Sequence, residues 1–98
     1  MFKLLPQQIP SVSVTSFDNA SSTKVLNKAR NRRIFGIVNR GTTVMEVRLN
    51  DAGNGDPIYL KAASTLTAAD GGSLEFNGYN GYVYAKGTGY VYHFSEDV

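Results

Sequence analysis

The chain has 98 residues, no cysteine and a formal net charge of +2. This length suits one small domain, and the missing cysteines exclude disulfide bonds as a source of stability. No run approaches the roughly 20 apolar residues of a membrane-spanning helix. The first residues also lack the apolar run of a signal peptide, so we expect a protein made in the cytoplasm.

The beginning of the chain predicts an extended N-terminal arm, residues 1–10, ahead of a single domain at 11–98. Pro6 and Pro10 interrupt this segment, and it has no pattern of a packed element. Arms of this kind become ordered on a neighbouring molecule or stay disordered. The arm offers three apolar candidates for partner contacts: Phe2, Leu4 and Leu5.

After the arm, short runs rich in Val, Ile, Thr, Tyr and Phe are divided by Gly and Asn, and no segment has a helical period. We expect about eight strands, at 11–17, 24–26, 33–39, 44–49, 57–62, 73–76, 82–86 and 90–95. Regularly spaced short strands are typical of a small β-sandwich or a jelly-roll-like barrel. The sequence therefore predicts an all-β fold of antiparallel strands.

Very short connections separate the last strands. Asn77-Gly78, Asn80-Gly81 and Gly87-Thr88-Gly89 contain residues that tolerate positive φ. Links of this length are typical of tight hairpins. We therefore interpret Gly87-Thr88-Gly89 as the turn between two strands.

Alternation along the strands assigns the core. The residues expected to point inward are Phe35, Ile37, Met45, Val47, Leu49, Ile58, Leu60, Leu74 and Phe76. If Val83 and Ala85 also point inward, Tyr82 and Tyr84 point outward on one face. Glu46 and Arg48 are expected to point outward. Ile34 and Val38 are apolar on the opposite face of their strand, which predicts that a second layer or another subunit covers it.

Two places could carry chemistry, and a structural role is favoured at both. His93 is the available base for nucleophilic catalysis, but it lies in mid-strand between two aromatic residues. The loop 50–56 contains oxygen ligands without the spacing or the closing Glu of a calcium-binding EF-hand. We therefore expect no catalytic residue, no metal, no cofactor and no enzyme activity.

Positive charge is concentrated in one segment. Six of the ten basic residues lie between positions 24 and 40, where there is no acid. Phe35 is the one aromatic residue among them and is expected in the core, so nucleic acid is disfavoured as a partner. An acidic protein surface, or the acidic end of a neighbouring subunit, is favoured. The candidate contacts in this segment are Lys28, Arg30 and Arg32.

Five of the six tyrosines lie within residues 79–92. The candidate contacts among them are Tyr82, Tyr84, Tyr90 and Tyr92. Tyrosine has a rigid apolar ring with a polar tip, which suits protein interfaces and stacking on sugar rings. Cross-strand aromatic pairing that stabilises a sheet explains the same pattern. Both interpretations stay open.

Several short motifs follow one another in a characteristic order. They are Val25-Leu26-Asn27, the strand from Arg33 through Ile37 to Asn39, Pro57-Ile58-Tyr59-Leu60, Gly71-Gly72-Ser73-Leu74, Gly78-Tyr79 and Gly81-Tyr82-Val83-Tyr84-Ala85. In this order the chain resembles the small virion domains of tailed bacteriophages. The resemblance covers roughly residues 11–96.

Such domains are β-sandwiches or jelly rolls that serve as capsid decoration (cement) proteins, head fibres or tail accessories. The resemblance implies a non-enzymatic structural protein on the capsid surface that binds the major capsid protein or other virion proteins. It also implies a homo-oligomer, with a trimer favoured. The alternatives are a tail, fibre or head-tail accessory protein, and a carbohydrate-binding β-sandwich module.

Overall fold

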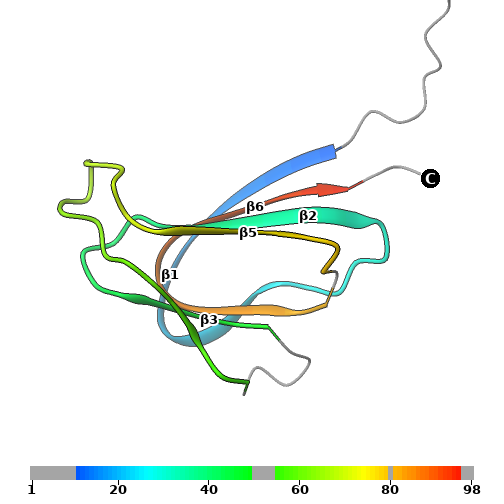
Figure 1. Cartoon of the computed structure of the whole chain (residues 1–98), viewed down its shortest axis with the longest axis horizontal. Helices are drawn as coiled ribbons and strands as arrows, with labels where there is room; N and C mark the ends of the chain where they lie inside the picture. Colours follow the sequence, from blue (N-terminus) through cyan, green and yellow to red (C-terminus); the bar gives the residue numbers. More distant parts are fainter. Residues whose placement is uncertain (1–10, 50–54, 80, 96–98) are drawn as a thin grey trace, which may run out of the picture.

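The computed structural model describes residues 11–49, 55–79 and 81–95 (Figure 1). The expected N-terminal arm lies outside these residues. Within them the chain is all-β, as predicted, and six antiparallel strands form one sheet. The strands are β1 (Ser11–Leu26), β2 (Arg32–Asn39), β3 (Met45–Arg48), β4 (Ile58–Leu60), β5 (Ser73–Asn77) and β6 (Val83–Ser95).

β6 organises the sheet. The strand order is β4-β3-β6-β2-β5, and β1 pairs with β6 from Ser11 to Leu26. The first part of β6 pairs with β3, and the part from Gly89 onward pairs with β2. β6 bends between these two parts, so the sheet curls back over its own core as a half-barrel (Figure 1).

The expectation of eight strands is wrong because two pairs of expected strands are continuous. Segments 11–17 and 24–26 both belong to β1, with a register shift between Asn19 and Thr23. Segments 82–86 and 90–95 meet in β6, so Gly87-Thr88-Gly89 is a bend within one strand and not a hairpin turn. All six strands belong to one hydrogen-bonded sheet, so the predicted β-sandwich or jelly roll is not confirmed.

The bend requires glycine at two positions. Gly87 has a φ of 139°, a conformation that side chains with a Cβ rarely adopt. A Cβ on Gly89 would lie 1.9 Å from the carbonyl oxygen of Val38 and 2.8 Å from Cε of Met45. Glycine therefore lets β6 change direction while β2 and the Met45 side chain stay in close contact with it.

Thr88, between these glycines, fixes the bend to its neighbours. Its carbonyl accepts hydrogen bonds from the amides of Arg40 and Gly41, both at 3.0 Å. Its hydroxyl donates to Oδ1 of Asp18 in β1 at 2.7 Å. The bend is thus joined to β1 and to the segment that leaves β2.

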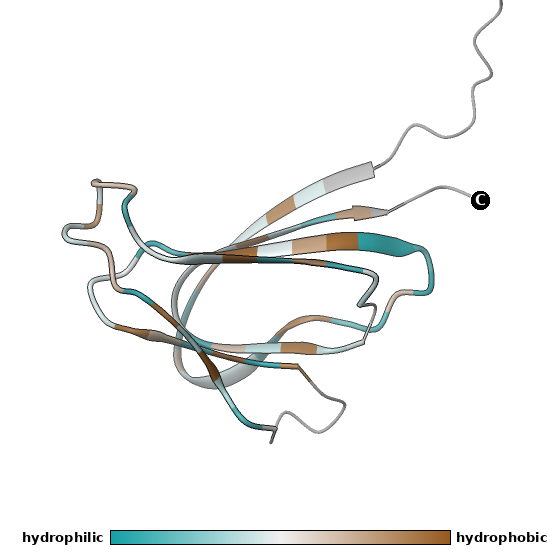
Figure 2. Ribbon diagram, viewed as in Figure 1, coloured by the Kyte–Doolittle hydropathy of each residue, from teal (hydrophilic) through white to brown (hydrophobic). Residues whose placement is uncertain are grey.

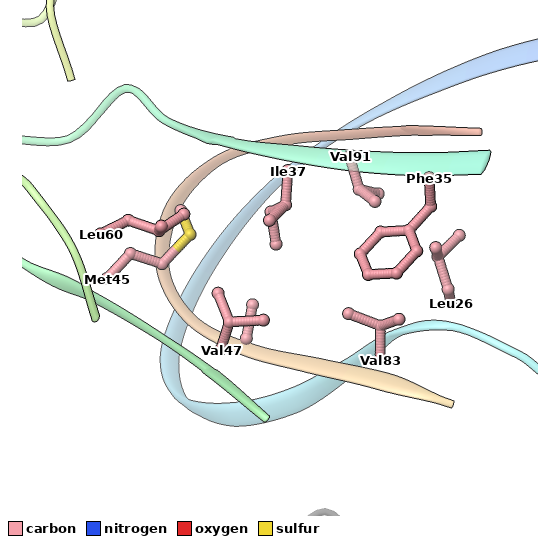
Figure 3. Close-up of a cluster of buried hydrophobic side chains, with 9 residues drawn as sticks. Leu26, Phe35, Ile37, Met45, Val47, Leu60, Val83 and Val91 are labelled. Carbon is pink, nitrogen blue, oxygen red and sulfur yellow. The ribbon is translucent and has the colours of Figure 1, made fainter. Parts of the chain in front are cut away.

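The hydrophobic core lies between the two halves of the curled sheet (Figure 3). Its buried members are Leu26, Phe35, Ile37, Met45, Val47, Leu60, Val83, Ala85 and Val91. The inward positions predicted at Phe35, Ile37, Met45, Val47 and Leu60 are confirmed, and Val83 and Ala85 are buried as well. The other predicted residues pack on this core and are partly buried: Leu49, Ile58, Leu74 and Phe76. Hydrophobic and hydrophilic residues are interspersed along the strands in Figure 2.

A buried asparagine ties the end of β2 to two other segments. Asn39 is 1% exposed. Its Nδ2 donates to the carbonyls of Thr43, Leu60 and Lys61 at 2.8, 3.1 and 3.0 Å. Its Oδ1 accepts from the amide of Gly41 at 2.9 Å. One amide side chain thus satisfies backbone groups of the loop before β3 and of the end of β4.

We expect Asn39→Ala to lower the free energy of unfolding by about 3 kcal/mol or more, because it leaves several buried backbone groups without partners. Urea unfolding at neutral pH measures this loss. Asn77→Ala, at an exposed position of β5, is the matched control and should change stability by less than about 0.5 kcal/mol. Equal losses in the two variants would contradict the role of Asn39.

Candidate interaction surface

Residues of β6 alternate between the core and the outside. Val83, Ala85 and Val91 are buried, so Tyr84, Lys86, Tyr90, Tyr92 and Phe94 point outward. The bend divides these outward residues between the two halves of the sheet. Each half therefore has its own outer surface.

The surface over β2 and the second part of β6 is apolar, and we call it the aromatic face. It consists of Val14, Ile34, Val38, Tyr90, Tyr92 and Phe94. The register places Ile34 opposite Phe94, and Val38 opposite Tyr90. Val14, opposite Tyr92, is 64% exposed. Ile34 and Val38 are half-buried, so within one chain the outer side of β2 is only partly covered.

Tyr92 is held firmly at the centre of this face. A Cβ on Gly36 would lie 2.1 Å from Cζ of Tyr92, so glycine lets the ring lie directly over β2. The Tyr92 hydroxyl donates to Oε2 of Glu75 in β5 at 2.7 Å. That hydrogen bond, together with burial and the charges of Glu75 and Tyr90, raises the pKa of Tyr92 to about 12.

Arg40 marks one end of the aromatic face. Its guanidinium carbon lies 5.9 Å from the ring centroid of Tyr90. It also borders two shallow hollows of about 230 and 220 Å³. The first is lined by Ser16, Phe17, Arg40, Leu66, Thr88 and Gly89, and the second by Val38, Asn39, Arg40, Ala69 and Tyr90. The aromatic face is therefore bordered by two hollows, and Arg40 lines both of them.

The surface over the first part of β6 combines cations with tyrosines, and we call it the basic face. It consists of Lys24, Lys28, Glu46, Arg48, Tyr59, Tyr82, Tyr84 and Lys86. Nζ of Lys24 lies 4.2 Å from the centroid of Tyr82, and Nζ of Lys28 lies 5.4 Å from it. The rings of Tyr82 and Tyr84 meet edge to face at 6.4 Å.

Residues of neighbouring strands lie side by side in rows across this face. Tyr84 lies between Lys24 of β1 and Arg48 of β3. In the next row, Glu46 lies between Lys86 of β6 and Tyr59 of β4. Tyr59 is 63% exposed. Rings and charges from four strands thus share one outer surface.

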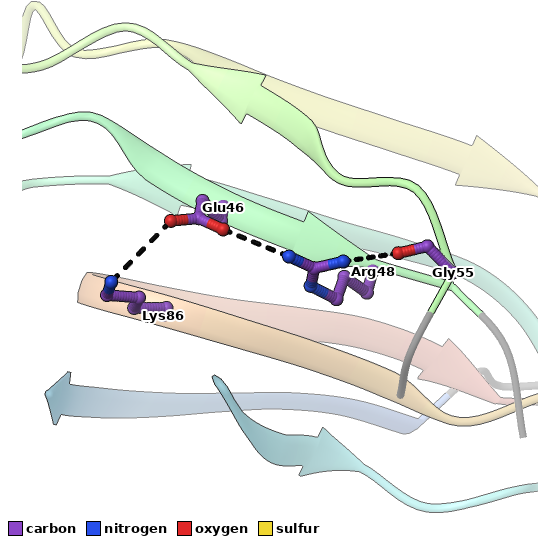
Figure 4. A network of polar contacts seen from close by, with 4 residues as sticks. All are labelled: Glu46, Arg48, Gly55 and Lys86. Atoms are coloured by element: carbon purple, nitrogen blue, oxygen red, sulfur yellow. Dashed lines mark hydrogen bonds and ion pairs between the residues drawn. The ribbon is translucent and has the colours of Figure 1, made fainter. Parts of the chain in front are cut away.

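Glu46 joins two of the cations (Figure 4). Its Oε1 lies 3.2 Å from Nη2 of Arg48, and its Oε2 lies 3.7 Å from Nζ of Lys86. Arg48 also donates to the carbonyl of Gly55. The network fixes Arg48 against the sheet, while Lys86 stays largely exposed.

Arg32, one of the candidate contacts, is 3% exposed and lies on neither face. Its guanidinium donates to the carbonyls of Asn27, Gly81 and Tyr79 at 2.8, 2.5 and 3.4 Å. Burial lowers the pKa of Arg32. Its bonds to three separate carbonyls give it a structural role inside the domain.

The remaining candidates divide between surface and interior. Arg30 is exposed in the turn between β1 and β2. Phe2, Leu4 and Leu5 lie outside the described residues. His93 is half-buried, and burial followed by the charge of Arg32 lowers its pKa. In residues 11–49, 55–79 and 81–95, no three His, Asp or Glu side chains are grouped to hold a metal, and no helix is long and apolar enough to span a membrane.

The sequence could not assign the neighbours of Tyr82 and Tyr84. Alternation predicted that Arg48 and Glu46 point outward, but it carries no signal for which strand lies next to which. Tyr59 is exposed, in agreement with the same alternation, but no pattern in the sequence marks it as part of a site. Comparisons with models of protein families, with curated proteins and with solved structures found no match, so the two faces carry the functional argument.

Two arginines of one segment should respond differently to charge reversal. Arg32→Glu places a carboxylate against three carbonyls and should lower the free energy of unfolding by more than about 3 kcal/mol. Arg30→Glu, at an exposed position, should change it by less than about 0.5 kcal/mol. Urea unfolding of both variants measures the difference. Similar stabilities would show that the guanidinium of Arg32 is not needed inside the domain.

The bond from Tyr92 to Glu75 predicts a pH dependence. Because the pKa of Tyr92 is raised in the folded protein to about 12, its contribution to stability should be complete below pH 10 and lost as the pH rises toward 12. Absorbance at 295 nm is followed as the pH is raised above roughly 9, in the parent and in Tyr92→Phe. The difference between the two curves is the titration of the Tyr92 hydroxyl. In Glu75→Gln this titration should shift downward. An unchanged midpoint would contradict the assigned bond.

Proposed function

We propose that this chain is a non-enzymatic structural protein that attaches to a larger protein assembly through its aromatic face. The assembly we propose is the capsid of a tailed bacteriophage, where the chain acts as a decoration (cement) protein bound to the major capsid protein. Burial of the aromatic face would join the chain to the shell and resist separation of its subunits.

The observation that carries this proposal is the row at the centre of the aromatic face, in which exposed Val14 lies beside three half-buried aromatic rings. Val14 is 64% exposed beside Tyr92, and the rings of Tyr90 and Phe94 flank Tyr92 with centroids 6.5 and 6.0 Å away. Contiguous apolar surface of this kind marks interaction sites, and the centres of protein interfaces are enriched in aromatic residues.

The rigidity of the face also favours binding. Tyr92 is held between Gly36 and the carboxylate of Glu75, so it loses little conformational freedom when a partner covers it. Arg40 and the two hollows that it lines supply a charged edge that can fix the orientation of a partner.

The capsid as partner and the oligomeric state come from the resemblance of the sequence to small virion domains. Half-buried Ile34 and Val38 on the aromatic face are compatible with contacts between copies as well as with a shell. We therefore propose a homo-oligomer, with a trimer favoured, on the particle surface. A position in the tail, on a fibre or at the head-tail junction uses the same face and is the nearest alternative.

A carbohydrate-binding module is the candidate from another class. Tyr90 and Tyr92 present neighbouring rings that are tilted by 40° to one another, and tyrosine rings can stack on sugars. Binding of the purified chain to a glycan array, lost in Tyr90→Ser, would support this candidate in place of shell attachment.

Binding to undecorated shells tests the proposal. The double variant Val14→Ser/Tyr90→Ser should bind purified shells about tenfold more weakly or worse, because it removes apolar contacts from the centre of the face. The melting temperature should fall only slightly, since Val14 is exposed and Tyr90 is partly exposed.

The matched control is Val44→Ser/Tyr59→Ser. It changes the same residue types where they are 55% and 63% exposed, away from the aromatic face. We expect parental binding from this control. Equal binding by all three proteins, or binding to isolated tails and not to shells, would overturn the proposed attachment to the capsid.

A further inference from the structure

We propose that the basic face binds single-stranded nucleic acid. This function is separate from attachment through the aromatic face, because the two faces lie on the outer sides of different halves of the curled sheet. The proposal rests on the charge of the basic face, on its rings, of which Tyr59 is exposed and Tyr82 and Tyr84 are half-buried, and on their arrangement.

Among the residues that the structure describes, this face has four cations and one carboxylate. The cations are Lys24, Lys28, Arg48 and Lys86. Arg48 and Lys86 share the single carboxylate of Glu46, so its negative charge is divided between them. Positive potential therefore dominates this surface and favours a polyanion.

Aromatic rings lie among these charges. Tyr84 is flanked in its row by Lys24 and Arg48, and exposed Tyr59 ends the row that begins at Lys86. The rows cross four neighbouring strands, a width of roughly 14 Å at about 4.8 Å per strand. The basic segment of the sequence lacks interleaved aromatic residues, and the fold supplies them from β4 and β6.

This alternation favours a nucleic acid over an acidic protein. In a single strand, negative phosphates alternate with flat bases, and non-sequence-specific binders offer cations for the phosphates and aromatic rings for the bases. An acidic protein surface would pair with the cations but has no regular alternation of charge with flat rings that matches this arrangement. Single strands are also favoured over duplex, whose bases are already stacked on one another.

The test is fluorescence anisotropy of the full chain with a labelled oligo(dT) of about 16 nucleotides, at about 50 and 200 mM salt. We expect binding that weakens as salt rises. Tyr59→Ala should weaken it about fivefold or more, the effect of losing one stacked base. Lys24→Gln/Lys28→Gln should also weaken it, and should lower the slope of log K against log salt by about 1.4, or about 0.7 for each phosphate contact.

Matched controls come from the aromatic face. Arg40→Gln removes one cation and Tyr90→Ala removes one ring, and both should leave oligonucleotide binding unchanged. Thermal unfolding checks that each variant is folded. Because Tyr59 is mostly exposed, its variant keeps the test valid even if the lysine variant unfolds.

Three outcomes would overturn the proposal. The first is no oligonucleotide binding at the lower salt. The second is equal weakening by Arg40→Gln and by the lysine variant, which indicates attraction to overall charge. The third is binding of poly-glutamate at least as tight as that of oligo(dT), with no effect of Tyr59→Ala on either, which assigns the face to an acidic protein. None of these three outcomes affects the proposal that the chain binds shells through Val14 and Tyr90.

Discussion

The fold depends on the bend in β6. A single strand can serve both halves of the sheet only because Gly87 adopts a positive φ and Gly89 lets the carbonyl of Val38 approach closely. Met45 packs against both glycines from the inside, so the bend and the core are built from the same contacts. Without this bend, β2 and β3 could not pair with the same edge of β6 and enclose Phe35 and Val47 between them.

The bend also explains why one strand contributes to two different surfaces. Side chains alternate along β6 with period two, so the residues that do not enter the core all point outward. The change of direction sends Tyr90 and Tyr92 to one half and Tyr84 and Lys86 to the other. Their surroundings then differ: Tyr92 meets Val14 and Gly36, whereas Tyr84 meets Lys24 and Arg48.

Buried polar side chains at the two ends of β2 secure the irregular segments around these surfaces. Arg32, at the beginning of β2, binds carbonyls of the segments before β2 and before β6. Asn39, at the end of β2, binds carbonyls of the loop before β3 and of the end of β4. Each side chain satisfies backbone groups that the sheet does not pair, which would otherwise be costly to bury. The loops beside both faces are therefore held by β2, although neither anchor is part of a face.

The sequence by itself determined the strand character of the chain and most of the core, because alternation is a local property that β-strands impose on neighbouring residues. It could not decide whether Gly87-Thr88-Gly89 turns a hairpin or bends one strand, since both need glycine. It also could not show that Arg32, a candidate partner contact, is buried, because its carbonyl partners include Gly81, 49 positions away. Tertiary structure alone decided which charges surround which tyrosines, because those neighbours come from strands far apart in the chain and are fixed by the pairing of β6 with β1 and β3.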